Sequence, residues 1–81
     1  MVKKLKKSKK INAGANLKEI RLELGLSQQE VGDLVGTGQS YISAIENGRQ
    51  DFRAPLARNL IKAFKKTYKR IIIPQDFGLE D

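Results

Sequence analysis

The sequence contains no cysteine and no histidine. Without cysteine, the chain can form neither a disulfide framework nor a thiolate zinc site, which fits an intracellular protein. Without histidine, it lacks the commonest general base and metal ligand. A phosphate loop of the form GxxxxGK[ST] is also missing, and Ser27, Ser40 and Ser43 have no sequence context that suggests a nucleophile. We therefore expect no enzymatic activity, no metal and no cofactor.

Long apolar runs are also absent. No stretch approaches the roughly 20 residues that a membrane-spanning helix needs, and no apolar segment of signal-peptide length follows the basic N-terminus. A chain of 81 residues is long enough for one small domain. Because the core of such a domain is small, dimerisation or ligand binding would add to its stability.

The charge is strongly one-sided, with 16 Lys and Arg against 9 Asp and Glu and a net charge of +7. The hydrophobic fraction of 40% and the charged fraction of 31% are typical of a globular protein. An excess of positive charge points first to nucleic acid as a partner and second to an anionic membrane surface. Charge alone fits a merely soluble basic protein equally well, so the sequence pattern has to decide.

Positive charge is concentrated in the first ten residues, MVKKLKKSKK. Such a segment is either a solvated, disordered terminus or an arm that orders on DNA, and the two interpretations are compatible. We assign residues 1–13 to a flexible basic arm, residues 14–70 to a helical domain and residues 71–81 to a C-terminal extension. The arm lysines are Lys3, Lys4, Lys6, Lys7, Lys9 and Lys10.

Four segments have the pattern of short helices. Asn16 is the expected N-cap of a first helix over Leu17–Leu24, which Gly25 ends. Ser27 and Glu30 have the spacing of a capping box and predict the start of a second helix, which ends at Gly36. The third helix is expected over Gln39–Glu46. A fourth begins near Pro55, with a core face formed by Leu56, Leu60, Ile61 and Phe64.

Two further segments need an explanation. Gly32 lies inside the second helix at a cost of about 1 kcal/mol relative to alanine, which predicts a close approach by another helix. The run Ile71–Ile73, followed by Pro74, fits a short edge strand or an extended segment that packs across the domain or against a partner. The expected fold is therefore all-α, a compact bundle of four to five short helices with a basic N-terminal arm and this C-terminal extension.

The second and third helices are joined in the pattern of a helix-turn-helix, with a small residue at Gly32, a turn at Gly36 and a β-branched residue at Ile42. The stretch LSQQEVGDLVGTGQSYISAIENG resembles the Cro/C1-type (XRE family) helix-turn-helix of lambda-like and 434-like phage repressors. The resemblance covers roughly residues 17–64. The chain departs from the family at Gly32, where alanine is usual.

The resemblance implies a recognition helix over residues 39–46 in the DNA major groove. Gln39 holds the first position of this helix, and a glutamine there suits adenine, because its amide can donate to N7 and accept from N6 together. The residues expected on the base-facing surface are Gln39, Ser40, Tyr41, Ser43 and Ala44. The expected phosphate contacts are Gln28, Asn47, Arg49 and Arg53, and Gln28 is also expected to support Gln39.

Two other features follow from the same resemblance. Arg21 and Glu46 are expected to form a partly buried ion pair between the first and third helices. The lysine arm resembles that of lambda-type repressors in charge and position. If it neutralises phosphates, affinity should fall steeply with salt.

The function expected is a sequence-specific double-stranded DNA-binding regulator, a repressor that binds a near-palindromic operator as a homodimer. Its location would be the cytoplasm of a prokaryotic cell or phage-infected host, in association with the nucleoid. One alternative is an antitoxin-type protein-binding module that also regulates its own operon, with RIIIPQDFGLED covering a protein partner. Another is a basic protein that coats DNA without sequence preference.

Overall fold

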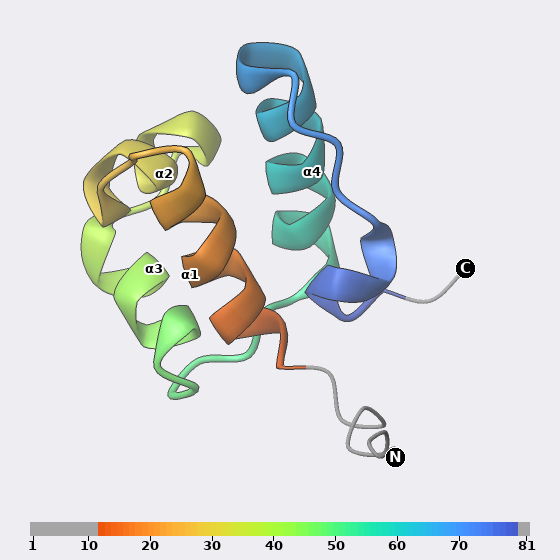
Figure 1. The fold of residues 1–81 in the computed structure, drawn as a ribbon. Coiled ribbons are helices and arrows are strands. Elements are labelled where there is room, and N and C mark those ends of the chain that lie inside the picture. The colour runs from red at the N-terminus through yellow and green to blue at the C-terminus, as the bar shows by residue number, and fades with distance from the viewer. Residues whose placement is uncertain (1–11, 80–81) are drawn as a thin grey trace, which may run out of the picture.

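The computed structural model describes residues 12–79, which form four α-helices and one 3-10 helix (Figure 1). The helices are α1 (Ala13–Glu23), α2 (Gln28–Val35), α3 (Gln39–Glu46) and α4 (Ala54–Tyr68), followed by the 3-10 helix η2 (Pro74–Phe77). Residues 12–79 contain no strand, and none of their helices is both long enough and apolar enough to cross a bilayer. The expected all-α class is confirmed. The lysines of the expected arm lie outside the described residues.

Helix α1 begins earlier than the sequence pattern predicts. Its N-cap is Asn12, whose side-chain oxygen accepts a hydrogen bond from the backbone N–H of Ala15 at 3.0 Å. The prediction that Asn16 is the cap is wrong, because Asn12 already closes the first turn. Asn16 instead donates from Nδ2 to the carbonyl oxygen of Asp76 at 2.8 Å and so ties α1 to η2. The helix thus starts at Ala13, inside the range assigned to the arm.

The bounds of α2 and α3 follow from the signals in the sequence. Both hydrogen bonds of the Ser27–Glu30 capping box are present at the start of α2. Gly36 ends the helix in the left-handed conformation, with φ of 76°, where a side chain would be strained. Helix α3 then runs over the residues expected of it, Gln39 to Glu46.

Gly32 faces the turn and not a second helix. A Cβ atom at this position would lie 2.5 Å from the backbone oxygen of Thr37 and 3.3 Å from the carbonyl group of Gly38. The expectation of a helix against Gly32 is therefore corrected. The small residue lets the backbone of the turn between α2 and α3 pass close to α2.

One apolar core joins all five elements. Leu17 and Ile20 of α1, Val31 of α2 and Ile42 and Ile45 of α3 are buried in it. Helix α4 adds Leu60 and Phe64 as expected, together with Ala57, whereas Leu56 and Ile61 are only partly buried. Leu34 and Val35 of α2 also lie at the margin of the core. The remaining buried members of this core are Leu26, Ile72 and Phe77.

The C-terminal extension packs along the domain as an extended segment that ends in η2. Ile72 is 4% exposed and Phe77 1% exposed, whereas Ile71 and Ile73 are about 60% exposed. This alternation resembles a strand, but no neighbouring strand among residues 12–79 pairs with it, so the edge-strand alternative is wrong. The alternative of a segment packed across the domain is confirmed. In Figure 1 this segment descends beside α4 and brings η2 next to the start of α1.

A surface ion pair helps to hold this extension. Arg70 donates from Nε and Nη2 to the two carboxylate oxygens of Glu23, at 2.7 and 3.1 Å. This hydrogen bonding lowers the pKa of Glu23 below its ordinary value near 4.5 and raises that of Arg70.

Candidate nucleic-acid interface

Helix α3 presents its polar side outward and its apolar side to the core. Ile42 and Ile45 are buried, three residues apart on one face. At the N-terminal end of the helix, Gln39 and Ser40 are exposed. Gly38 precedes them in an extended conformation and makes no side-chain cap, so the first turn of α3 leaves its backbone N–H groups uncapped by this residue.

The other three residues expected at base edges are less exposed. Tyr41, Ser43 and Ala44 are each partly buried, and Tyr41 packs against the apolar core. The ring of Tyr41 therefore has a packing role beside any contact with DNA. The structure brings all five predicted base-facing residues onto one short helix, with the two at its beginning the most accessible.

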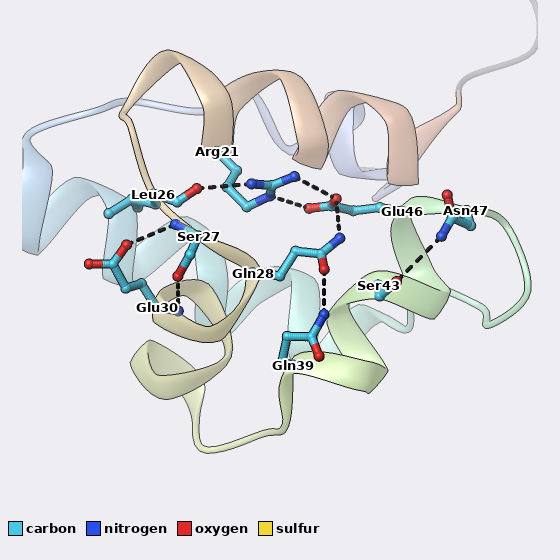
Figure 2. A network of polar contacts seen from close by, with 9 residues as sticks. All are labelled: Arg21, Leu26, Ser27, Gln28, Glu30, Gln39, Ser43, Glu46 and Asn47. Atoms are coloured by element: carbon cyan, nitrogen blue, oxygen red, sulfur yellow. Dashed lines mark hydrogen bonds and ion pairs between the residues drawn. The ribbon is translucent and has the colours of Figure 1, made fainter.

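Gln39 is held by a hydrogen bond from the neighbouring helix. Its Nε2 donates to Oε1 of Gln28, at the first position of α2, over 2.6 Å. Gln28 in turn donates from its own Nε2 to Oε1 of Glu46 over 3.0 Å. Figure 2 shows these side chains in a row between α1 and the outer face of α3, with the carbonyl oxygen of Gln39 turned away from Gln28.

The inner end of this row is a buried ion pair. Arg21 donates from Nε to Oε2 of Glu46 at 2.7 Å and from Nη2 to Oε1 at 3.0 Å. Its third donor, Nη1, bonds the carbonyl oxygen of Leu26 at 2.9 Å. The pairing expected between these two residues is present, and its two parallel bonds are the strong, oriented kind that arginine and carboxylate form. Removing one partner alone would leave a buried charge unpaired, at a cost of about 3–5 kcal/mol.

Three of the four predicted phosphate contacts follow the C-terminal end of α3, and the fourth, Gln28, is the first residue of α2. Asn47, Arg49 and Arg53 are exposed in the loop between α3 and α4 and at the start of α4. Backbone bonds from Arg49 and Gln50 to the carbonyl oxygen of Ala44 fold this loop onto the end of α3, at 2.8 and 3.2 Å. Within residues 12–79, neither Arg49 nor Arg53 forms an ion pair, so both guanidinium groups remain available to an anion.

Sequence reasoning missed two parts of this site. The bond between Gln28 and Glu46 joins α2 to α3, and no spacing in the sequence indicates it. The close contact at Gly14 was also missed: a Cβ there would lie 2.1 Å from the backbone oxygen of Ile45, so α1 approaches the end of α3 closely. The signal in the sequence was a glycine close after Asn12, a possible N-cap, because a glycine inside a helix needs a packing reason.

Comparison with known proteins identifies the motif. The family model described as helix-turn-helix matches residues 17–71. The chain belongs to the XRE-type helix-turn-helix family. It is 32% identical over 63 residues to an uncharacterized HTH-type transcriptional regulator, y4dJ, of Sinorhizobium fredii, a match that covers 78% of this chain and 82% of that protein. No solved structure matches the chain significantly.

Membership of the XRE-type helix-turn-helix family gives the chain a general function, which is DNA binding in transcription regulation. The family is typically non-enzymatic. The match ends at residue 71, so Ile72 and Phe77, which complete the core, lie beyond the part of the chain that the family model covers.

Proposed function

We propose that this protein is a sequence-specific repressor that binds a near-palindromic operator as a homodimer, with α3 in the major groove. The observation that supports it best is the state of Gln39. Its side chain is exposed at the beginning of α3, yet one of its hydrogen bonds is already fixed by Gln28. A surface glutamine without a role would be free to rotate, whereas an oriented amide is suited to base recognition.

The remaining contacts divide into base and phosphate groups. Gln39 pairs with adenine and Ser40 bonds a neighbouring base edge, while Ala44 offers its methyl group to thymine. Gln28, Asn47, Arg49 and the basic arm bind phosphates, which position the domain without selecting sequence. Arg53, at the start of α4, joins this second group.

The two-fold symmetry of the proposed homodimer determines the spacing of the operator half-sites. Two copies of α3 would enter successive major grooves at half-sites about 10–10.5 base pairs apart, or a multiple of that spacing. Blocking of RNA polymerase at such a site would make the protein a repressor. Because the function is exercised on DNA, its place is the cytoplasm, at the nucleoid.

A protein partner remains the second candidate function, since Ile71 and Ile73 are about 60% exposed beside the buried Ile72. These two side chains are the surface that an antitoxin would offer to a toxin, or one protomer to its homodimer partner. Ile72 and Phe77 of the same segment are not available to a partner, because both are buried in the core of this chain. Copurification of a second protein would favour the antitoxin.

Selection of bound duplexes from a random DNA library tests the main proposal. A two-fold symmetric motif at near-physiological salt would support a dimeric repressor and provide its operator. An asymmetric motif would retain base recognition and refute the symmetric dimer. Binding without any enriched motif would refute sequence specificity and favour a protein that coats DNA.

Substitution of Gln39 tests the base contact itself. Gln39→Ala should weaken binding to the operator by about 1–3 kcal/mol per half-site and relax the preference at one base pair. Affinity for random DNA should hardly change, because Gln39 makes no phosphate contact in this proposal. An equal loss on operator and random duplexes would show that Gln39 does not recognise a base.

A further inference from the structure

Gln28 has only one way to place its amide group. Its terminal nitrogen is 3.0 Å from Oε1 of Glu46, and that oxygen also accepts from Arg21. A carboxylate paired with arginine can only accept hydrogen bonds. If the amide were reversed, two oxygens would face each other at that distance with no proton between them. The carboxylate of Glu46 therefore fixes the Gln28 nitrogen toward the interior and the Gln28 oxygen toward Gln39.

The same restriction passes to Gln39. The Gln28 oxygen accepts from Nε2 of Gln39 at 2.6 Å, and a reversed Gln39 amide would put two carbonyl oxygens that close together. Gln39 must therefore keep its nitrogen toward Gln28. One of the two Nε2 protons is used in this bond, which leaves the other proton and the whole of Oε1 for a partner outside the protein. Figure 2 shows Oε1 of Gln39 on the outer side of the row.

We infer that Glu46 is a positioning residue for base recognition: its buried carboxylate fixes the direction of the Gln28 amide, and through it the face that Gln39 presents to DNA. Glu46 is 8% exposed and lies at the far end of α3 from Gln39, so it acts without contacting a base. This inference rests on the proposed function, since it assumes that Gln39 contacts a base pair.

The chemical consequence is selectivity among bases. An amide fixed in one direction offers one acceptor and one donor in a set order, which fits N6 and N7 of adenine. An amide free to reverse can adapt to other donor and acceptor patterns in the major groove, so the preference at that base pair weakens. The ion pair thus affects specificity separately from any effect on stability.

The first experiment removes the ion pair without leaving a buried charge. In the double variant Arg21→Met/Glu46→Leu, both charged groups are replaced by apolar side chains, an exchange that often preserves folding. The matched control is Arg70→Met/Glu23→Leu, because this exposed pair has the same two-bond geometry and no link to Gln28. Circular dichroism and thermal melting establish that each variant is folded.

The measurement is the dissociation constant for an altered duplex divided by that for the selected operator. One duplex is the selected operator, and the other differs only at the base pair whose preference Gln39→Ala relaxes. The buried-pair variant should lower this ratio by roughly tenfold, most of what one bidentate amide–adenine contact supplies. The control should leave the ratio as it is in the wild type. An unchanged ratio in the folded buried-pair variant would overturn the inference.

A second variant keeps the test decisive if the buried-pair variant does not fold. Gln28→Leu retains the Arg21–Glu46 ion pair and breaks the connection to Gln39. Loss of a phosphate contact by Gln28 weakens binding to every duplex equally, so only loss of orientation lowers the ratio. A lowered ratio supports the step from Gln28 to Gln39 through which Glu46 acts, and an unchanged ratio overturns the inference.

Spectroscopy of the free protein separates this inference from the proposed function. The side-chain amide signals of Gln28 and Gln39 in 15N-labelled protein should both shift in the buried-pair variant, and their exchange with water should accelerate. The control should move neither. If the Gln39 signal stays in place, the orientation does not reach Gln39 and the inference fails, whatever the DNA experiments show. If the amide signals respond but the wild type selects no motif, the proposed function fails instead.

Discussion

Replacing Gly14 with alanine should destabilise the fold, although alanine is the better helix former. The added Cβ would lie 2.1 Å from the backbone oxygen of Ile45, 3.1 Å from its carbonyl carbon and 3.4 Å from Cα of Glu46. All three neighbours are backbone atoms, so no change of side-chain rotamer relieves the contact. Either α1 or the end of α3 has to move.

The expected magnitude follows from two opposing terms. Helix propensity favours alanine over glycine by about 1 kcal/mol. Overpacking of a close contact costs about 1–3 kcal/mol, and this contact belongs to the upper part of that range because it involves rigid backbone. The net loss of stability should be about 1–2 kcal/mol, which corresponds to a fall in Tm of roughly 5–15 °C for a domain of this size.

Thermal and urea denaturation, followed by circular dichroism, measures this difference. The control is Gly38→Ala, because a Cβ at Gly38 meets no atom within 4 Å and its φ of −86° suits any residue. Because Gly38 is the N-cap of α3, where alanine is less favourable than glycine, that control should cost about 0.5–1 kcal/mol of unfolding free energy at most, less than Gly14→Ala. A Gly14→Ala variant as stable as the wild type would refute the close approach of α1 to α3.

Three other predictions concern charge and local conformation. Glu23→Gln should lower Tm at neutral pH, and the difference in Tm from the wild type should close as the pH falls below about 4.5. The pKa of Glu23 is lowered in the folded protein, so the ion pair stabilises the fold above about pH 4.5. This stabilisation is lost as the carboxyl group is protonated. A difference in Tm of the same size at about pH 3 and at about pH 7, on either side of the ordinary pKa near 4.5, would contradict this. Lys69→Gly should raise stability by about 0.5–1 kcal/mol, because Lys69 ends α4 in the left-handed conformation at φ of 58°. Lys69→Ala should not, because an alanine side chain is as unfavourable as a lysine side chain in that conformation. Deleting residues 1–10 should weaken binding to all duplexes and flatten the dependence on salt, at about 0.9 of log–log slope per lost phosphate contact; a loss confined to the operator would contradict a phosphate-binding arm.

Local signals in the sequence predicted the helix-turn-helix itself. The capping box at Ser27 and Glu30, the turn at Gly36 and the bounds of α3 each depend on residues within a few positions of one another. The start of α1 was predicted wrongly because Asn12 and Asn16 are equally good caps on local grounds. The structure distinguishes the two: Asn12 accepts from the backbone N–H of Ala15, whereas Asn16 donates to the distant carbonyl of Asp76.

The other two errors concern what lies opposite a residue in the fold, which the sequence pattern does not give. Gly32 was expected to face a helix, but the backbone of its own turn lies against it. The Ile71–Ile73 run has the alternation of a strand, and only the absence of a pairing strand within residues 12–79 decides against one.

Some contacts of the candidate site were predicted from the sequence and others were not. The pairing of Arg21 with Glu46 and the support of Gln39 by Gln28 were expected from the family resemblance, and both bonds are present. The connection between the two pairs, from Gln28 to Glu46, depends on how three helices meet. The contacts to bases and phosphates stay predictions, because they depend on the DNA.

The burial of Phe77 has a consequence for the newborn chain. Leu17 and Phe77 lie in one core, although Leu17 belongs to α1 and Phe77 is the last residue of η2. Synthesis proceeds from the N-terminus, so α1 to α4 leave the ribosome while the space for Phe77 is still unfilled, and domains generally fold as units. The helix-turn-helix, although its motif ends by residue 46, therefore reaches its final packing only after translation has passed Phe77. A released chain that ends before Phe77 should therefore be more sensitive to protease than the full chain.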